Sequence, residues 1–232
     1  MKKLSKFLIV FLSIFLMNNL SAKPFVKDLS SNPIISNLVC KLRDPLTGRK
    51  KFRKSLTKVG EYLALKISED LETFEKPVKT LLNETATHQV IDDSKVVLIT
   101  ILRAGVPFFN GMLNVFPKSE AGFFAMARDE KTLESDVFYK ALPDIEGKTV
   151  LLTDTMLATG GSIINALKVL NKKNPKQIII VGAIAAKKGI ENVLAFDPSV
   201  KIYTASIDPT LNEVGYIVPG LGDAGDRCYG FK

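Results

Sequence analysis

The chain has few of the side chains that most often bind transition metals, with one histidine and two cysteines among 232 residues. Cys40 and Cys228 lie far apart and outside any C-x-x-C pair, so neither a zinc site nor a disulfide framework is indicated. With His88 as the sole histidine, a histidine-rich metal site or a serine–histidine triad has no support. The simplest interpretation of His88 is a surface residue before a strand.

Internal repeats and low-complexity blocks are also missing, and 46% hydrophobic content is enough for one sizeable core. The formal net charge is +8, but Lys2, Lys3 and Lys6 contribute to it from an N-terminal segment without acids. No basic run is interleaved with aromatic residues, so nucleic-acid binding is not predicted. The remaining lysine excess fits a solvated surface or the steering of an anionic substrate.

The N-terminus resembles a secretory signal peptide, with a basic start, the apolar run Phe7–Met17 and a candidate cleavage point after Ala22. Leu20, three residues before that point, is larger than the usual small residue. The run is also shorter than the roughly 20 residues that cross a bilayer. We therefore expect a signal-like or membrane-anchor segment at 1–22, a linker at 23–37 and one domain at 38–232.

A helix is expected over Phe52–Leu71, where apolar residues recur at helical spacing. Beyond it, continuous apolar runs typical of buried strands alternate with helix-like segments. The expected strands are Val96–Leu102, Ala121–Ala127, Thr149–Thr153, Gln177–Ala186 and Val200–Ile207. This alternation predicts an α/β fold with a mostly parallel central sheet flanked by helices.

The stretch VLLTDTMLATGGSIINALKVL, Val150–Leu170, leads from a strand through a lone acid and a glycine-rich turn into a helix. Gly160 and Gly161 let the backbone approach a ligand closely, and Thr159 and Ser162 add hydroxyl donors. The helix N-terminus favours a phosphate. The turn matches neither a Walker phosphate loop nor G-x-G-x-x-G, and taken alone it is equally compatible with a plain capped connection.

Other candidate residues also follow strand ends, where parallel sheets bind ligands. Arg103 follows Val96–Leu102 in an Arg-Ala-Gly turn, and a guanidinium there can grip a diphosphate with two parallel hydrogen bonds. Arg128 opens the charged stretch RDEKTLE, which alone is more typical of an exposed hairpin. The last strand leads into a long glycine- and proline-rich tail whose apolar residues indicate an ordered, functional segment.

Four motifs, ILRAG, RDEKTLE, DTMLATGGS and GYIVPGLGDAGDR, stand in the order and approximate spacing of uracil phosphoribosyltransferases. The chain resembles this family from about Leu38 to its C-terminus. The last motif is the specific one, because other type I phosphoribosyltransferases share a phosphate turn but not this tail. Two departures are the signal-like extension and Thr155, which stands where the family usually has proline after the acid.

The resemblance implies the type I phosphoribosyltransferase fold, with a small irregular C-terminal segment that binds the base. It implies the reaction of uracil with phosphoribosyl diphosphate to give UMP and diphosphate. Mg²⁺ would be carried by the sugar substrate near Asp223, without a direct protein ligand. Arg103, Arg128 and Asp223 would form the catalytic set.

The resemblance also assigns the substrate contacts. Phosphoribosyl diphosphate would contact Arg103, Arg128, Asp154, Thr155, Met156, Leu157, Ala158, Thr159, Gly160, Gly161, Ser162 and Asp223. Uracil would contact Ile217, Gly222, Asp223 and Ala224. Uracil presents acceptor, donor and acceptor along its O2–N3–O4 edge, which backbone groups of a glycine-rich loop can match. No side chain is an obvious general base for uracil N1, and Asp223 is the nearest candidate.

Three alternatives stay open at this point. The first is a phosphoribosyltransferase for hypoxanthine, guanine or orotate, against which the single acid Asp154 and the tail count. The second is an RNA-binding attenuator of pyrimidine operons on the same fold. The third is a secreted or membrane-tethered protein that has kept the fold but lost its substrate supply. We expect a cytoplasmic active domain, a homo-oligomer of two or more copies, GTP as a candidate effector, no nucleic-acid partner, and membrane contact only through an uncleaved N-terminal segment.

Overall fold

The computed structural model describes residues 24–128 and 135–231, without the side chains of residues 127, 128, 135 and 136. Its centre is a sheet in the order β1–β9–β8–β7–β4–β5–β6, with β10 beside β8. These strands are β1 Phe25–Asp28, β4 Val96–Leu102, β5 Glu120–Arg128, β6 Ser135–Ala141, β7 Thr149–Leu157, β8 Gln177–Ala186, β9 Lys201–Thr204 and β10 Ile207–Asp208. Every pairing is parallel except that of β5 with β6.

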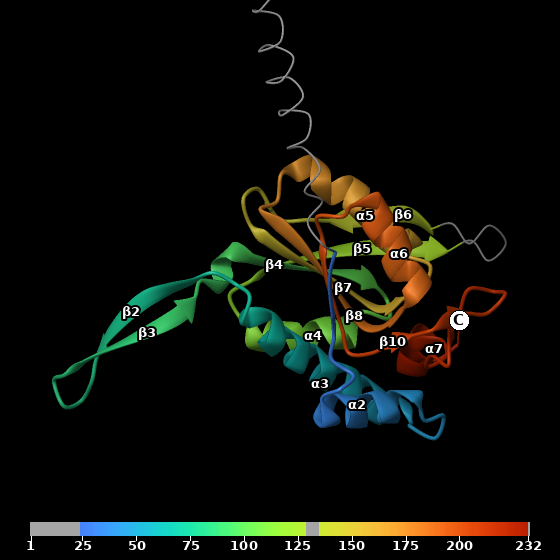
Figure 1. Ribbon diagram of the computed structural model, residues 1–232, viewed down its shortest axis with the longest axis horizontal. Helices are drawn as coiled ribbons and strands as arrows, with labels where there is room; N and C mark the ends of the chain where they lie inside the picture. Colours follow the sequence, from blue (N-terminus) through green and yellow to red (C-terminus); the bar gives the residue numbers. More distant parts are fainter. Residues whose placement is uncertain (1–23, 129–134, 232) are drawn as a thin grey trace, which may run out of the picture.

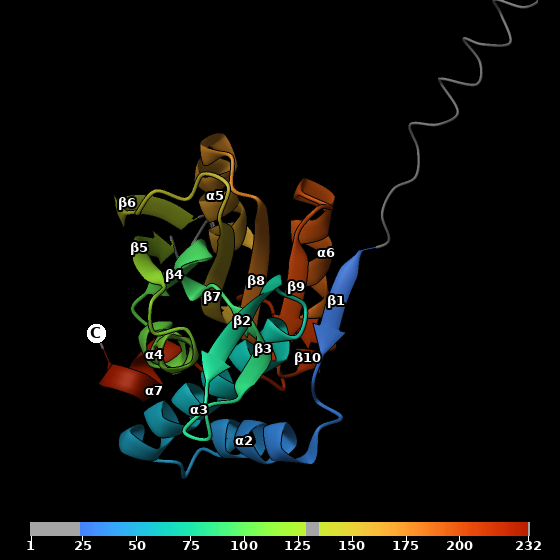
Figure 2. The same ribbon diagram turned by 90° about the vertical axis from the view of Figure 1, so that its left-hand side faces the viewer.

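Helices cover both faces of this sheet (Figures 1 and 2). The helices are α2 Pro33–Arg43, α3 Arg49–Ser68, α4 Val106–Val115, α5 Gly161–Leu170, α6 Lys187–Phe196 and α7 Ala224–Tyr229. In Figure 2, α5 and α6 lie above the sheet, whereas α3 and α4 lie below it with α2 as the outermost layer. Two short 3-10 helices, η2 Asp93–Lys95 and η3 Asn171–Lys173, precede β4 and follow α5.

The continuous apolar runs form central strands because both faces of the sheet are buried. Leu98, Leu151 and Ile179 are aligned on β4, β7 and β8 and pack in the cluster that includes α3 and α4. The residues one position earlier, Val97, Val150 and Ile178, pack in the cluster with α5 and α6. Alternation along each strand thus divides one apolar run between two cores.

The predicted α/β architecture with a mostly parallel sheet is confirmed. Strands β4 and β8 have the predicted bounds, and α3 begins and ends three residues before the helix expected at Phe52–Leu71. The expected last strand is divided, because β9 pairs with β8 up to Thr204 and β10 then pairs with β8 again further on.

Two regions differ from the expectation. The segment 23–37, expected as a linker, instead contains β1, which pairs with β9, and the start of α2. A hairpin of β2 Thr73–Lys79 and β3 Thr85–Ile91 was not foreseen, and Figure 1 shows it reaching away from the body. Its residues are largely exposed and so lack the alternation that marks a strand packed on a core.

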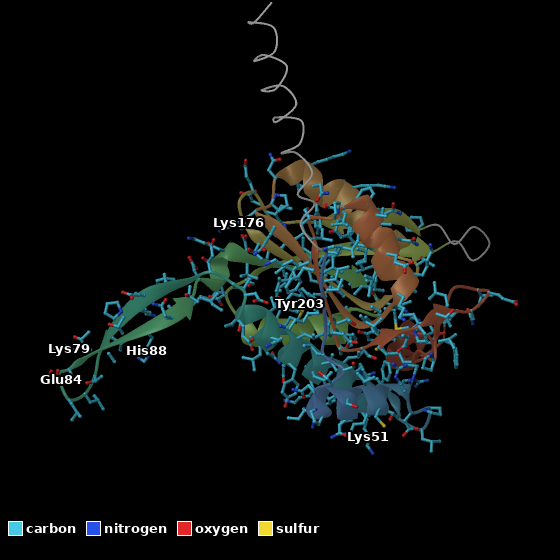
Figure 3. All side chains as sticks on the ribbon, viewed as in Figure 1. Lys51, Lys79, Glu84, His88, Lys176 and Tyr203 are labelled. Carbon is cyan, nitrogen blue, oxygen red and sulfur yellow. The ribbon has the colours of Figure 1, made fainter. Side chains whose placement is uncertain are left out.

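Figure 3 places Lys79, Glu84 and His88 on this hairpin and Tyr203 in the body of the protein. His88 is exposed within β3 rather than before a strand. The buried Tyr203 hydroxyl donates a hydrogen bond to Asp70, just beyond α3, and its ring contacts Phe25 of β1. The β1 edge and the end of α3 thus meet at one aromatic side chain.

The signal-like segment 1–22 lies outside the described residues. Within residues 24–128 and 135–231, no helix combines the length and the apolar character needed to cross a bilayer.

Candidate active site

A pocket of about 840 Å³ lies at the carboxyl ends of β4 and β7, between the start of α5 and the C-terminal segment. The two sides of the pocket come from parts of the chain far apart in sequence. One side is Arg103 with the turn 156–162, and the other is formed by 214–217 and 222–225. Parallel α/β sheets bind ligands at this edge, so the fold places the predicted motifs where a ligand site is expected.

The glycine-rich turn has the geometry of an anion site. Gly160 has φ +87°, which a side-chain-bearing residue rarely adopts, and α5 begins at Gly161. The Asn192 amide of α6 donates to the carbonyl oxygen of Thr159 at 2.9 Å. This hydrogen bond holds the turn against α6, and the first backbone amides of α5 face the pocket.

Asp154 lies on β7 where the strand reaches the pocket. Burial raises the pKa of its carboxyl group to about 7, although the backbone N–H groups of Met156 and Thr155 hydrogen-bond to it and act in the opposite direction. Near neutral pH this acid therefore exchanges between a neutral form and a carboxylate that can accept hydrogen bonds from a diol.

Thr155, the residue in the family's usual proline position, does not line the pocket. Its side chain is buried, and its hydroxyl donates a 2.9 Å hydrogen bond to the carbonyl oxygen of Ala104. A direct contact with substrate therefore stays a prediction for Thr155. The hydrogen bond of Thr155 instead links β7 to the turn after β4.

Arg103 follows β4 after a cis peptide bond with Leu102 and lines the pocket. Its guanidinium donates to the Asp226 carboxylate at 2.8 Å and to the carbonyl oxygen of Gly230 at 3.1 Å. Both partners lie in or beside α7. Arg103 therefore bridges the sheet edge and the C-terminal helix, and it keeps further N–H donors for a ligand. Arg128 ends β5, but its side chain lies outside the described residues.

The C-terminal segment supplies the wall opposite the turn. A short ladder pairs β11, Thr210–Leu211, with β12, Ile217–Val218, and the pocket is lined both by Ile217 and by the following Gly222–Asp223–Ala224. The Asp223 carboxylate accepts a 2.8 Å hydrogen bond from the Asp226 amide and so caps α7. The stretch 222–224 is thus held in place by a helix start rather than by a regular strand.

All predicted site residues with described side chains, except Thr155, line this one pocket. The pocket also includes residues that the sequence interpretation left out: Ile101, Leu102, Ala104, Ala125, Met126, Ile163, Val214, Gly215, Tyr216 and Gly225. Gly215, Tyr216 and Gly225 belong to the tail motif itself, so membership of that motif could have identified them. Met126 carried no signal, since in the sequence it is one more apolar residue of a buried strand.

Comparison with known proteins gives a consistent result. A sequence model described as uracil phosphoribosyltransferase matches residues 29–231. A uracil phosphoribosyltransferase of Clostridium kluyveri is 42% identical over 203 residues, which are 87% of this chain and 97% of the relative. One from Bacillus pumilus is 41% identical over 212 residues, 91% of this chain and 100% of the relative.

A solved structure of a protein from Aquifex aeolicus superposes with a TM-score of 0.85 at 37% identity, covering 89% of this chain and 98% of that one. The motifs, the pocket that unites them and these similarities along most of the chain agree. The chain belongs to the uracil phosphoribosyltransferase family.

Proposed function

We propose that the chain transfers the 5-phosphoribosyl group from phosphoribosyl diphosphate to uracil, with the reacting atoms in the pocket described above. The observation that carries the assignment is the meeting, in one cavity, of the β7–α5 turn with the tail motif specific to this family. The tail counts against the purine and orotate alternatives, and the relatives' names favour uracil over an RNA-binding attenuator.

The β7–α5 turn binds the phosphoribosyl part. Amides at the start of α5, together with the hydroxyls of Thr159 and Ser162, donate to the 5′-phosphate, where the helix dipole also favours negative charge. The ionised Asp154 accepts hydrogen bonds from the two ribose hydroxyls. The backbone and side chains of residues 154–162 thereby orient the anomeric carbon toward the opposite wall.

The arginines act on the leaving group. Breaking the glycosidic bond builds negative charge on diphosphate and positive charge on the ribose ring, and donors already in place stabilise that charge in the transition state. Arg103 lines the pocket with a guanidinium held by Asp226, which limits the rearrangement needed to bind. Arg128 is proposed as the second donor, because β5, which it ends, also contributes Met126 to the pocket.

The C-terminal wall recognises the base. Ile217 offers an apolar surface to the uracil ring, and the backbone of Gly222, Asp223 and Ala224 can match its acceptor–donor–acceptor edge. Cytosine reverses part of this pattern and leaves buried groups unpaired, at about 1–3 kcal/mol for each one. Asp223 is the nearest candidate to accept the proton from uracil N1.

Magnesium fits this site as an ion carried by the substrate. Asp223 brings a carboxylate to the pocket near the proposed position of the ion, and Mg²⁺ commonly keeps several waters and binds through substrate phosphates rather than through a cage of protein ligands. No group of three or more potential ligand residues occurs in the part of the chain that the structure describes. When bound, the ion would neutralise charge on the departing diphosphate.

Homo-oligomerisation and activation by GTP belong to the same proposal, as does a cytoplasmic location of the active domain. The first is tested by light scattering across a concentration series, and the second by initial rates with and without GTP.

Turnover of purified protein tests the central assignment. We expect UMP from uracil and phosphoribosyl diphosphate only when a divalent metal is present, and no product from cytosine. Comparable rates with hypoxanthine or orotate would contradict the assignment to uracil. Salt-dependent binding of a pyrimidine leader RNA in a filter assay would instead favour the attenuator.

A further inference from the structure

The base-binding wall is tied to helix α2 by a partly buried ion pair. Arg43, the last residue of α2, donates from its two terminal nitrogens to the Asp208 carboxylate at 2.8 and 2.5 Å. Asp208 belongs to β10 and is only 3% exposed. These residues are 165 positions apart in sequence, and neither lines the pocket.

The same two side chains hold Gly220 from both of its backbone groups. Arg43 donates to the Gly220 carbonyl oxygen at 2.7 Å, and the Gly220 amide donates to Asp208 at 2.8 Å. Gly220 has φ +58°, and a Cβ atom there would lie 2.0 Å from the Ile217 carbonyl oxygen. Arg43 and Asp208 thus bind the backbone at a position that only glycine can occupy.

Gly220 and Leu221 end the segment that forms the base wall, and we call these two residues the neck. Asp208 starts this segment, and the β11–β12 ladder lies between Asp208 and the neck. Ile217 lines the pocket just before the neck, and Gly222 lines it just after. A shift at the neck must therefore move both the apolar and the polar contacts offered to a base.

A second arginine holds the other side of the neck. Arg227 of α7 donates to the Leu221 carbonyl oxygen at 2.9 Å and also to the carbonyl oxygens of Leu42 and Asp44. Residues 220 and 221 are thereby fixed between α7 and the end of α2. Because Arg227 makes these contacts independently of Arg43, loss of Arg43 would loosen the neck without releasing it completely.

We propose that Arg43 and Asp208 are positioning residues for uracil, which hold the wall 217–222 in the conformation that recognises the base. The proposal rests on the proposed function of the pocket and adds to it two residues outside the binding motifs. It predicts a selective effect, because the turn 154–162 makes none of the hydrogen bonds of this pair, and Asp223, which also faces the phosphoribosyl side, is held separately as the N-cap of α7.

The test separates positioning from stability. Arg43→Met alone leaves Asp208 buried without its partner and is expected to unfold more readily. The double variant Arg43→Met/Asp208→Asn removes the isolated charge, and its new side-chain amide oxygen can still accept from the Gly220 amide. We expect the double variant to be folded, with the KM for uracil raised about tenfold or more, because a charge-assisted contact to the loop is lost.

The KM for phosphoribosyl diphosphate and kcat should stay within about twofold of the parent values. Arg43→Lys, which keeps the charge and one donor, should recover part of the lost uracil affinity.

Two controls make the result specific. Ser206→Ala removes another hydrogen-bond partner of Arg43, at 3.2 Å, and leaves the hydrogen bonds of Arg43 and Asp208 with Gly220 in place. Val150→Ala creates a cavity in the other core, the cluster with α5 and α6, which contains none of the wall residues, and so lowers stability away from the wall. Both controls should keep the parental KM for uracil.

An unchanged KM for uracil in the folded double variant would overturn the proposal, as would an equal rise in both KM values. These outcomes differ from failure of the proposed function, in which the parent protein itself would make no UMP.

Discussion

The hydroxyl of Thr155 donates a 2.9 Å hydrogen bond to the carbonyl oxygen of Ala104, which joins the strand carrying Asp154 to the turn carrying Arg103. The Thr155 side chain therefore connects the ribose side of the proposed site with its diphosphate side. The family's usual proline could not make this bond, since it has no hydroxyl.

Replacing Thr155 by valine should weaken phosphoribosyl diphosphate binding. Valine keeps the branched shape but removes the donor to the Ala104 carbonyl oxygen, which is only partly buried, so we expect the KM for this substrate to rise about five- to tenfold. Thr155→Ser keeps the donor and should remain within about twofold. Steady-state kinetics of the two variants provides the measurement, and equal KM values for valine and serine would show that the bond does not position the substrate.

Asp154 should make activity depend on pH near neutrality. The carboxylate is the form that accepts from the ribose diol, and its pKa in the folded protein is raised to about 7 by burial. Below that pH we expect kcat/KM for phosphoribosyl diphosphate to fall about tenfold per unit, because this parameter reports the ionisation of the free enzyme. Asp154→Asn should bind the substrate more weakly and lose this part of the pH dependence, and a variant with the parental profile would contradict the assignment.

The raised pKa of Asp154 also affects stability, which should fall as the pH rises, whereas activity should increase. Since the folded pKa lies above that of the unfolded chain, the Asp154 contribution to the free energy of unfolding is complete below about pH 4 and is lost as the pH rises to about 7. Urea denaturation of parent and Asp154→Asn at pH 5 and pH 8 measures it. The stability difference between the two proteins should shift in favour of the asparagine variant at pH 8.

Loss of either proposed diphosphate arginine should lower turnover more than binding. Arg103→Ala and Arg128→Ala remove donors that act where leaving-group charge develops, so a drop in kcat of about 10²- to 10³-fold is expected. Lys148→Ala, which removes a cation paired with Glu120 away from the pocket, serves as the charge-matched control. Wild-type kinetics in both arginine variants would show that diphosphate binds elsewhere.

Much of this architecture could be predicted because the information is local. The runs that became β4 and β8 are apolar throughout, and a strand buried on both faces needs that pattern. The acid and glycines after β7 were recognisable because a strand, a tight turn and a helix start have residue preferences of their own. The order of motifs along the chain then identified the pocket before its geometry was known.

What could not be predicted depends on contacts between distant residues. Nothing near Arg43 or Asp208 in sequence indicates that they pair, and the exposed β2–β3 hairpin has no packed face to give it a period. The sequence likewise does not indicate where two helices pack closely against each other. A Cβ atom on Gly60 of α3 would lie 2.1 Å from the Phe108 carbonyl oxygen, and one on Gly111 of α4 would lie 2.0 Å from that of Thr57.

This close approach of α3 and α4 gives a stability prediction. Gly60→Ala must push the helices apart, so we expect the free energy of unfolding to fall by about 1–3 kcal/mol even though alanine is the better helix former. Gly48→Ala is the matched control, because no atom lies within 4 Å of its added methyl group and its φ of −67° suits alanine. Denaturant titration compares the two, and equal stability would mean that the helices adjust without cost.

The N-terminal segment provides the last prediction, because the described fold begins just after it. Strand β1 pairs with β9 from Phe25 onward, and the Phe25 ring packs 5.3 Å from that of Tyr203. A protein starting at Lys23 keeps this strand, so it should fold with parental stability and full uracil phosphoribosyltransferase activity.

A protein starting at Leu29 loses β1, exposes the edge of β9 and removes that aromatic contact. It should therefore unfold at lower temperature. Loss of activity in the protein starting at Lys23 would show that residues 1–22 are part of the working enzyme. The cytoplasmic location is proposed because phosphoribosyl diphosphate, the substrate proposed for the pocket, is an intracellular metabolite. Cell fractionation tests this location separately. Mature protein that begins at Lys23 and is found mainly outside the cytoplasm would refute it.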